Sequence, residues 1–495
     1  MMYGEEKSDS LIVAANLANN PQGAESVERR SGAKGNAEQP HMRRTQCRES
    51  MSQRLSRVRE AAKQRKKERF TALFHLLTAE ALENAFLSLS RKAAAGVDGV
   101  RWKDYAENLK VNIADLHRRL HQGSYRAQPG RRHYIPKADG KQRPLGIASL
   151  EDKIVQYALV KILNAVYEND FMGFSYGFRP GRSQHNALDA LATGLVRTNV
   201  NWVLDADISQ FFDKVSHEWL IRFIEHRIGD QRVIRLIRKW LTAGTSEEGE
   251  WRASEEGTPQ GAVISPLLAN IYLHYVFDLW AHQWRRRHAT GNVVMVRYAD
   301  DIVIGFDKRI DAQCFRIAMQ RRLKEFGLTV HPKKTRLMEF GRFAAENRAS
   351  RGKGKPETFN FLGFTHISGK DRSGRFMLIR KTRRDRMTAT LKAIKDGLRK
   401  RWHYSIPEQG KWLRRVVQGY LNYHSVPGNY PMMRKFRIYV TDLWRRALRR
   451  RSQQDDTTWT KANRLAAVWL PKVRVLHPWP VERFTARHPR QEPGA

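Results

Sequence analysis

Two adjacent carboxylates, Asp300 and Asp301, lie between two apolar runs in the stretch VVMVRYADDIVIGF, residues 293–306. Both runs are rich in β-branched residues, so the sequence predicts a hairpin with the acidic pair at its tip. Aspartate is common in turns because it accepts local hydrogen bonds, and the pair alone is consistent with a plain turn. The alternative is a metal site, and other features of the chain favour it.

A second acidic site follows another apolar run, in LDADISQFF. The two-residue period of a strand places Asp205 and Asp207 on one face. Carboxylates that converge from two strand ends suit Mg²⁺, which prefers oxygen ligands and binds through one or two carboxylates plus substrate phosphates. Two such ions about 4 Å apart activate an attacking hydroxyl and stabilise a leaving oxygen. The sequence therefore predicts phosphoryl transfer with two Mg²⁺ ions, for which Mn²⁺ is a substitute.

The composition indicates a polyanionic partner. The 495 residues include 90 lysines and arginines against 50 acidic residues, a formal net charge of +40. An excess of this size favours nucleic acid, which we expect rather than an anionic membrane. The length is typical of about three domains, and 41% hydrophobic residues are enough for folded cores.

Cysteines and apolar runs bear on the compartment. Cys47 and Cys314 are the only cysteines and lack CxxC spacing, so neither a disulfide framework nor a cysteine zinc site is expected. The N-terminal MMYGEEKSDS is acidic before any apolar run and does not resemble a signal peptide. No run reaches the roughly 18 apolar residues of a membrane span. We expect a soluble cytoplasmic protein without a membrane partner.

The N-terminal part changes character near residue 45. Residues 1–45 show no sustained period and predict a disordered leader. The segment after it carries a dense basic run on a predicted helix, for which phosphate contact is favoured over a merely solvated face. YAENLKVNIADLHRRLHQGSY predicts an amphipathic helix, RRHYIPKADGKQRPLGI two strands joined by an Asp-Gly turn, and 150–168 a further helix.

The C-terminal part reads as helical. After about residue 372 strands become rare, and MRKFRIYVTDLWRRALRRRSQ predicts a helix with one apolar face. That face, expected to be core, consists of Met433, Phe436, Val440, Leu443 and Ala447. Arginines crowd the other face and end in three in succession, 449–451, which repel one another unless phosphates lie nearby.

Seven ordered blocks resemble one family. YADD (298–301) is similar to the catalytic box of reverse transcriptases. The other six are YIPKADGKQRPLGI (134–147), FSYGFRPGRSQHNAL (174–188), DADISQFFDKVSH (205–217), GTPQGAVISPLLANIYL (257–273), GLTVHPKKTRLMEF (327–340) and FNFLGF (359–364). The arginine-rich helices from about 380 to 452, with GYLNYH among them, resemble the thumb and maturase region. From about residue 45 onward the chain resembles the reverse transcriptase/maturases encoded by bacterial group II introns.

The resemblance implies an α+β right-hand polymerase: fingers and palm with an antiparallel sheet, then an α-helical thumb. The domains expected are a leader (1–45), an N-terminal helical extension of the fingers (46–130), fingers and palm (131–372), a thumb/maturase domain (373–455), and a basic tail (456–495) as a DNA-binding remnant. Asp207, Asp300 and Asp301 match the metal-binding catalytic triad. The backbone carbonyl of Ile208 is an additional metal ligand, and Asp205 is structural.

The resemblance also implies the residues that meet the incoming nucleotide. Lys137 and Arg143 match fingers positions that pair with the triphosphate, as their charge suits. Gln260 lies against the nucleotide or template. Phe212 excludes the 2′-hydroxyl of ribonucleotides, although Phe211 or Phe212 has to fill core. Lys334 is a candidate proton donor to pyrophosphate, with a solvated lysine as the alternative.

The expected partners are the group II intron RNA, the target DNA with its primer strand, and dNTPs. The residues expected to contact RNA are Arg65, Lys66, Lys67, Arg179, Arg182, Arg445, Arg446, Arg449 and Arg450. The protein would act in a ribonucleoprotein, associated with the nucleoid during integration. It would splice its intron as a maturase and copy it by target-primed reverse transcription during retrohoming.

One departure and two alternatives qualify the resemblance. Many relatives end in a cysteine-containing H-N-H endonuclease, and the stretch after RRRSQ has no cysteine, so second-strand cleavage is not expected. A polymerase-inactive maturase is one alternative, which the intact acidic residues argue against. A reverse transcriptase of retron, defence or diversity-generating type is the other, which the long basic helical region argues against.

Overall fold

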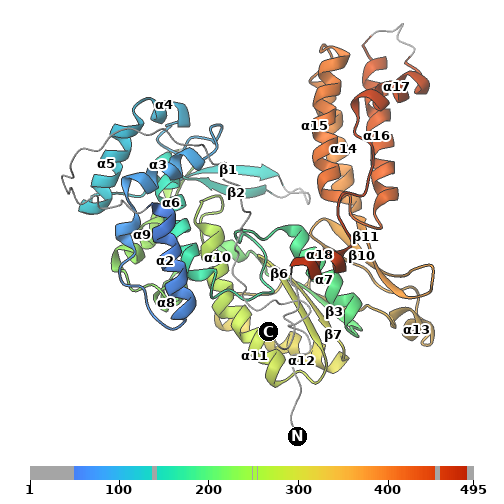
Figure 1. Cartoon of the computed structure of the whole chain (residues 1–495), viewed down its shortest axis with the longest axis horizontal. Coiled ribbons are helices and arrows are strands. Elements are labelled where there is room, and N and C mark those ends of the chain that lie inside the picture. Colours follow the sequence, from blue (N-terminus) through green and yellow to red (C-terminus); the bar gives the residue numbers. More distant parts are fainter. Residues whose placement is uncertain (1–49, 137–141, 248, 254, 452–456, 488–495) are drawn as a thin grey trace, which may run out of the picture.

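The computed structural model describes residues 50–136, 142–247, 249–253, 255–451 and 457–487. The predicted leader, the Asp-Gly turn and Lys137 lie outside these residues. Figure 1 shows a central palm with the fingers on one side and a tall helical thumb on the other. The predicted right-hand polymerase fold of the α+β class is confirmed.

The sheet of the palm carries the acidic residues. Its order is β6 (Val293–Tyr298), β7 (Asp301–Phe306), β3 (Trp202–Asp207), β8 (Arg336–Glu339), and all neighbours are antiparallel. β6 and β7 are buried along nearly their whole length, which explains their continuous apolar runs. The helices α7 (Gln184–Arg197) and α12 (Arg309–Glu325) pack against this sheet.

Shorter elements complete the palm and connect it to the fingers. They are η2 (Phe211–Asp213), α8 (His217–Glu225), α9 (Gln231–Thr242), α10 (Ser265–Leu273), η3 (His274–Asp278), α11 (Leu279–Arg287) and α13 (Ala344–Ala349). Among them η3 is a turn of π-helix that joins α10 and α11 into one continuous helix.

The fingers combine helices with a second sheet. The helical elements are α2 (Met51–Gln64), η1 (Phe74–Leu76), α3 (Ala79–Ser88), α4 (Trp102–Glu107), α5 (Leu109–Gln122) and α6 (Leu150–Tyr167). The sheet order is β2 (Gln142–Ile147), β1 (Gly130–Pro136), β4 (Thr245–Glu247), β5 (Glu250–Arg252). The predicted hairpin and the helix from Leu150 are present. The predicted amphipathic helix is present as α5, with the shorter α4 separated from it at Asn108.

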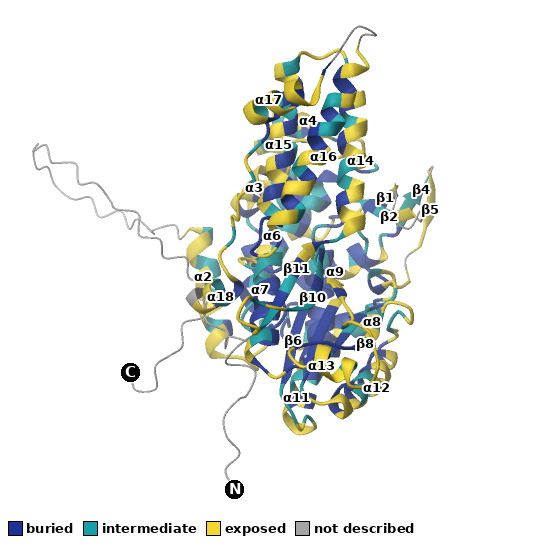
Figure 2. Cartoon of the chain, turned by 90° about the vertical axis from the view of Figure 1, so that its right-hand side faces the viewer, coloured by how far each residue is buried: buried dark blue, intermediate teal, exposed yellow. Residues whose placement is uncertain are grey.

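Strands continue further along the chain than the sequence predicted. A third sheet, ordered β11 (Phe376–Thr382), β10 (Phe364–Lys370), β9 (Phe359–Phe361), extends past residue 372, and helices start only with α14 (Arg384–Arg399). Next come α15 (Ile406–His424), α16 (Tyr430–Arg449) and α17 (Trp459–Trp469). The predicted apolar face of α16 lies in a thumb core separate from that of the palm and fingers, and Figure 2 shows these helices with buried inner and exposed outer faces.

The described part of the C-terminal tail packs against the body of the protein. The last helix, α18 (Pro480–Arg487), lies beside α7 in Figure 1. Arg483 donates to Asp189 of α7 at 2.9 Å, and the rings of His477 and His185 stack with centroids 4.0 Å apart. This segment therefore joins the thumb to the palm, a role that its basic composition did not suggest. No helix among the residues described is both long and apolar enough to cross a membrane.

Candidate active site and nucleic-acid interface

The acidic turn between β6 and β7 is a two-residue hairpin loop. Tyr298 pairs with Asp301, so Ala299 and Asp300 alone form the loop. Two-residue hairpin loops favour positive φ at their first central residue, usually glycine. Ala299 takes that place with φ 58°. The turn therefore holds an unusual backbone conformation directly before the first of its two aspartates.

The register of the sheet brings the third aspartate to the same place. Asp207, the last residue of β3, is the direct partner of Asp301 in the antiparallel β3–β7 pair. Burial, followed by repulsion from Asp300, Asp207 and Asp205, raises the pKa of Asp301 to about 7. Burial also raises the pKa of Asp300, with Asp207 adding to the shift. The carboxylates are thus close enough to destabilise one another's charge, which a bound cation would reverse.

A lysine supplies the nearest positive charge. Nζ of Lys334 lies 2.7 Å from Oδ2 of Asp207. The loop before Lys334 is attached to the same strand end, because the backbone N–H of His331 donates to the carbonyl of Asp207 at 2.7 Å. Among the described residues, no three acidic, histidine or cysteine side chains are gathered closely enough to hold a metal ion as they stand. In this arrangement Lys334 partly neutralises the acidic cluster.

The sequence left open which of Phe211 and Phe212 fills the core, and the two differ in burial. Both follow β3 in η2, after Gln210, which has φ 48°. Phe211 is 2% exposed and belongs to the core, whereas Phe212 is only partly buried. Phe211 therefore fills the core, and Phe212 packs against that core while it stays partly exposed. Its selection against ribonucleotides remains a prediction.

The remaining predicted nucleotide contacts lie around the same loop. Nε2 of Gln260 donates to Asp213 at 2.8 Å, and the carbonyl of Gln260 accepts from the N–H of Gly146 in β2 at 2.7 Å. Arg143 is exposed on β2, and its charge opposes the rise in the pKa of Asp300. Ile208 is buried and forms an isolated bridge with Val330. The fingers strand and the acidic turn therefore face a common space.

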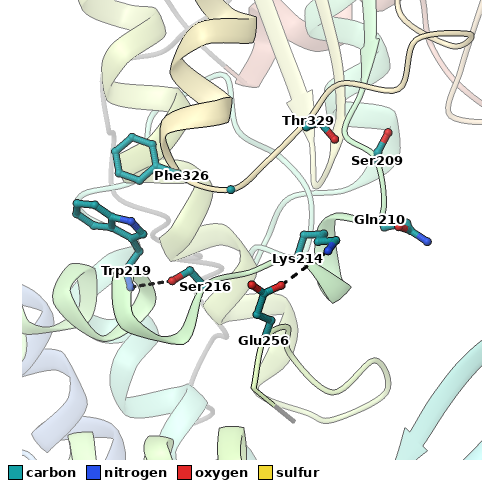
Figure 3. A pocket seen from close by; sticks show the side chains of 9 residues that line it. Ser209, Gln210, Lys214, Ser216, Trp219, Glu256, Phe326 and Thr329 are labelled. Carbon is teal, nitrogen blue, oxygen red and sulfur yellow. Dashed lines mark hydrogen bonds and ion pairs between the residues drawn. The ribbon is translucent and has the colours of Figure 1, made fainter.

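A cavity of about 420 Å³ lies on the far side of the loop that follows Asp207. Ser209, Gln210 and Thr329 line one end, Trp219 and Phe326 the other, and an ion pair of Lys214 with Glu256 spans part of it (Figure 3). Asp207, Asp300 and Asp301 do not line it. The candidate active site is therefore at the strand ends that carry these carboxylates and not in this cavity.

The residues predicted to contact RNA fall into two groups. Arg65, Lys66, Lys67, Arg446, Arg449 and Arg450 are exposed. Arg445 is half-buried, pairs with Asp442 and lies over the ring of Trp459.

The structure corrects the prediction that Arg179 contacts RNA. Arg179 is 5% exposed, and its guanidinium binds Glu168 and two backbone carbonyls. Arg182 is also largely enclosed and donates to the carbonyl of Ser175 at 3.1 Å, so both hold the loop before α7.

The sequence analysis missed a buried polar network behind the turn. Arg297, in the apolar strand before YADD, binds Asp278 and Asn270 from the continuous helix α10–η3–α11. The signal was present, because an arginine within VVMVRY and an aspartate within IYLHYVFDLW are charges in apolar stretches. Such charges are almost never buried unpaired. Only the fold shows that they pair with each other.

Part of the chain matches the model of a known protein family. Residues 135–366 match the model of the family described as reverse transcriptase (RNA-dependent DNA polymerase). The matched region is just under half of the chain and contains the acidic turn, both of its strands and β3. Reverse transcriptases generally use divalent metal ions, for which carboxylate oxygens are suitable ligands.

Parts of the chain are also similar to individual proteins of known sequence. The chain is 43% identical to protein YkfC of Escherichia coli over 206 residues, which are 41% of this chain and 54% of that protein. It is 37% identical to the group II intron-encoded protein LtrA of Lactococcus lactis over 223 residues, 44% of this chain and 37% of LtrA. The aligned part thus spans only about half or less of these relatives. The predicted resemblance to group II intron-encoded reverse transcriptases is confirmed.

Proposed function

We propose that this chain is an RNA-directed DNA polymerase that also binds its own group II intron RNA as a splicing cofactor. The observation that carries the proposal is the meeting of three carboxylates at adjacent strand ends inside a reverse transcriptase domain. Copying of the intron at a nicked target DNA, by target-primed reverse transcription during retrohoming, is part of the same proposal.

Three aspartates would hold two Mg²⁺ ions in this proposal. The carboxylates of Asp207, Asp300 and Asp301 are the ligands, with the backbone carbonyl of Ile208 as an additional donor. Bound metal ions supply activation of the primer 3′-hydroxyl and stabilisation of the leaving oxygen. The ion pair between Lys334 and Asp207 would have to open, because the same carboxylate oxygen cannot serve both cations fully. Mn²⁺ would substitute, since it also takes oxygen ligands.

Neighbouring residues would then orient the nucleotide. Once released from Asp207, Lys334 lies near the site and can donate a proton to the departing pyrophosphate. Arg143, with Lys137 beyond the described part of β1, would pair with phosphate charge. The half-buried ring of Phe212 would block a 2′-hydroxyl, and Gln260 would lie against the base pair being formed. The charge of Arg143, which opposes the rise in the pKa of Asp300, supports this arrangement.

RNA binding would depend on the exposed cations of α2 and the thumb. A net charge of +40 requires counterions in solution, and their release on binding RNA favours association. Arg446, Arg449 and Arg450 are exposed near the end of α16, and Arg65 and Lys66 follow α2. The intron RNA would perform cutting and joining, while the protein would stabilise its active fold.

Two assays on the purified chain test the proposal. Primer extension on an RNA template with dNTPs should occur with Mg²⁺ or Mn²⁺ and stop on adding EDTA. A matched pair of variants separates site from fold: Asp207→Asn should abolish extension, and Asp307→Asn, after the far end of β7, should not. Splicing of the intron around the coding region should be accelerated by both. Splicing without any extension by the natural chain would instead support a polymerase-inactive maturase.

A further inference from the structure

Arg297 is a fully buried arginine that connects the catalytic turn to the interior of the palm. Its exposure is 0%, and so is that of its partner Asp278. Nε and Nη2 of Arg297 donate to the two carboxylate oxygens of Asp278 at 2.7 and 2.5 Å. Nη2 also donates to the hydroxyl of Ser175 at 2.7 Å, and Nη1 donates to Asn270 at 3.2 Å. The guanidinium is therefore fixed from several directions.

The remaining hydrogen bond of Arg297 reaches the catalytic turn itself. Nη1 donates to the backbone carbonyl of Ala299 at 3.0 Å. Ala299 has φ 58°, a strained conformation for an L residue with a Cβ. A charge-assisted hydrogen bond in a buried environment offsets such strain. Arg297 thus stabilises the backbone conformation that aims Asp300.

The other side of the turn is held by a glycine. A Cβ built on Gly177 would lie 2.3 Å from the backbone nitrogen of Ala299, so only glycine allows this close approach. Asn270 fixes the glycine, because its Nδ2 donates to the carbonyl of Gly177 at 2.7 Å. Asn270 therefore contacts both Arg297 and the segment that covers the turn, and the turn is confined between them.

The π-helical turn η3 explains how one helix supplies both Asn270 and Asp278. In a regular α-helix, residues eight apart differ in direction by about 80°. The π-turn His274–Asp278 is wider, so each of its residues advances by less and the offset shrinks. Asn270 and Asp278 can then contact the same guanidinium. π-Turns are frequent at functional sites, and this one lies directly behind the acidic pair.

We propose that Arg297 is a positioning residue for catalysis, which holds the Ala299–Asp300 turn in the conformation that presents Asp300 and Asp301 to the metal ions. Asp278, Asn270 and Gly177 support it. The competing interpretation is that Arg297 and Asp278 are a buried pair that stabilises the palm and nothing more. The proposal rests on the proposed polymerase activity for its kinetic test, and on metal binding for an independent one.

The first test compares two conservative substitutions of buried arginines. Arg297→Lys keeps a charge for Asp278, but a single ammonium cannot also reproduce the fork that reaches Ala299. We expect kcat for primer extension to fall on the order of 100-fold, because small displacements at a reacting centre have effects of that size. KM for dNTP should stay within about 2-fold. The control, Arg380→Lys, alters a buried arginine of β11 that pairs with Asp189 of α7 at 3.6 Å and should leave kcat unchanged.

A rescue experiment separates positioning from general stability. Ala299→Gly removes the cost of the positive φ, so the turn no longer depends on the bond from Arg297. Added to Arg297→Lys, it should restore kcat about 10-fold without restoring the melting temperature. Gly177→Ala, which presses on the turn while leaving Arg297 intact, should reproduce the loss of kcat. A loss that follows the melting temperature, with no rescue by glycine, would overturn the proposal.

Metal binding keeps the inference independent of polymerase activity. Mn²⁺ titration of the folded chain, followed by electron paramagnetic resonance, should show about 10-fold weaker binding in Arg297→Lys and unchanged binding in Arg380→Lys. Equal Mn²⁺ affinity in Arg297→Lys and the natural chain would refute the positioning role even if no variant extended a primer. Absence of extension by the natural chain, with the Mn²⁺ difference present, would instead count against the proposed polymerase alone.

Discussion

Arginines are buried and paired at several positions in the palm and fingers, and exposed at the end of the last long helix of the thumb. In the palm and fingers, Arg179, Arg227 and Arg297 are at most 5% exposed, and their guanidiniums bind carboxylates and backbone carbonyls. On the thumb, Arg446, Arg449 and Arg450 are exposed to solvent at the end of α16. Arg227 and Arg297 connect segments that are distant in the sequence, and Arg179 holds its own loop. The exposed group is the one that we expect to contact a polyanion. A count of arginines therefore measures two different properties of the chain.

Arg227 shows the interior role in its fullest form. It binds Asp170 at 2.7 Å and donates to the carbonyls of Arg65 and Glu68 at 3.0 and 2.6 Å. It thereby fixes the segment that follows α2 and carries Lys66 and Lys67. One arginine that cannot contact RNA thus determines where several exposed cations lie.

The largest effect is expected from removing this interior arginine. Arg227→Met would leave Asp170 without its partner and several carbonyls without a donor. Breaking a buried pair from one side costs about 3–5 kcal/mol of unfolding free energy. Urea denaturation should show this loss. Arg238→Met, which removes an exposed arginine paired with Glu225 at 3.5 Å, should change stability by less than about 1 kcal/mol, and equal losses would erase the distinction between the two groups.

The exposed arginines should show the reverse pattern. Replacing Arg446, Arg449 and Arg450 together by Gln should weaken RNA binding by roughly 100-fold and reduce the slope of log K against log salt by about 2–3, one phosphate contact per arginine. The melting temperature should hardly change. Filter binding at several salt concentrations measures both quantities.

The matched control on the same helix is Arg445→Gln. Its guanidinium is largely covered by Asp442 and Trp459, so the salt slope should stay constant. A changed slope in Arg445→Gln, or an unchanged one in the triple variant, would contradict the assignment of RNA contacts by exposure.

Phe211 and Phe212 allow the same comparison between a buried and a partly exposed residue of one type. Phe212→Ala should weaken discrimination against ribonucleotides on the order of 30-fold, since the ring no longer fills the space for a 2′-hydroxyl. Phe211→Ala, in the core, should lower stability by about 3–5 kcal/mol instead and keep the discrimination. Competition between dNTP and NTP in primer extension gives the ratio. Equal discrimination in Phe212→Ala and the natural chain would remove Phe212 from the site.

The smallest effect concerns a buried histidine near the thumb. Burial lowers the pKa of His366 to about 3, with Arg380 adding to the shift. The unfolded chain, with a histidine pKa near 6.5, then binds protons that the folded chain does not. Stability is therefore lost as the pH falls from about 6.5 toward 3, by about 1.4 kcal/mol from this residue at pH 5.5.

Thermal unfolding between pH 7.5 and 5.5 tests this linkage. The rings of His366 and Phe359 stack with centroids 4.7 Å apart. His366→Phe keeps a ring in this position but cannot bind a proton, so it should reduce the pH dependence of stability. Exposed arginines do not titrate in this range, so the thumb triple variant should keep the natural pH dependence. An identical pH profile for His366→Phe and the natural chain would contradict the assignment.

Much of the fold and site could be predicted because the relevant signals are local. The apolar runs around Asp300 and Asp301 predicted a hairpin, and the apolar run before LDADISQFF placed Asp207 at a strand end, where it meets Asp301. The apolar face of α16 was predicted from its helical spacing and lies in the thumb core. These features depend on periodicity, which the sequence contains directly.

The rest depends on contacts between distant segments. Nothing local distinguishes buried Arg179 from exposed Arg446, because burial is decided by what packs on each side. The partnership of Arg297 with Asp278 needs both the sheet and the π-turn of the neighbouring helix. The attachment of the tail through Arg483 and Asp189 joins residues almost three hundred positions apart. Such pairings are set by tertiary structure, which outweighs local composition.

The central claim is that the acidic turn performs polymerisation while exposed basic surfaces bind RNA. The most direct test measures primer extension and intron RNA binding in one preparation of the variant Asp300→Asn plus Asp301→Asn. We expect extension to be lost entirely and the affinity for RNA to stay within about 2-fold of the natural chain. Extension that survives in the double variant would contradict the assignment of the catalytic centre. A parallel loss of RNA binding would contradict the separation of the two functions.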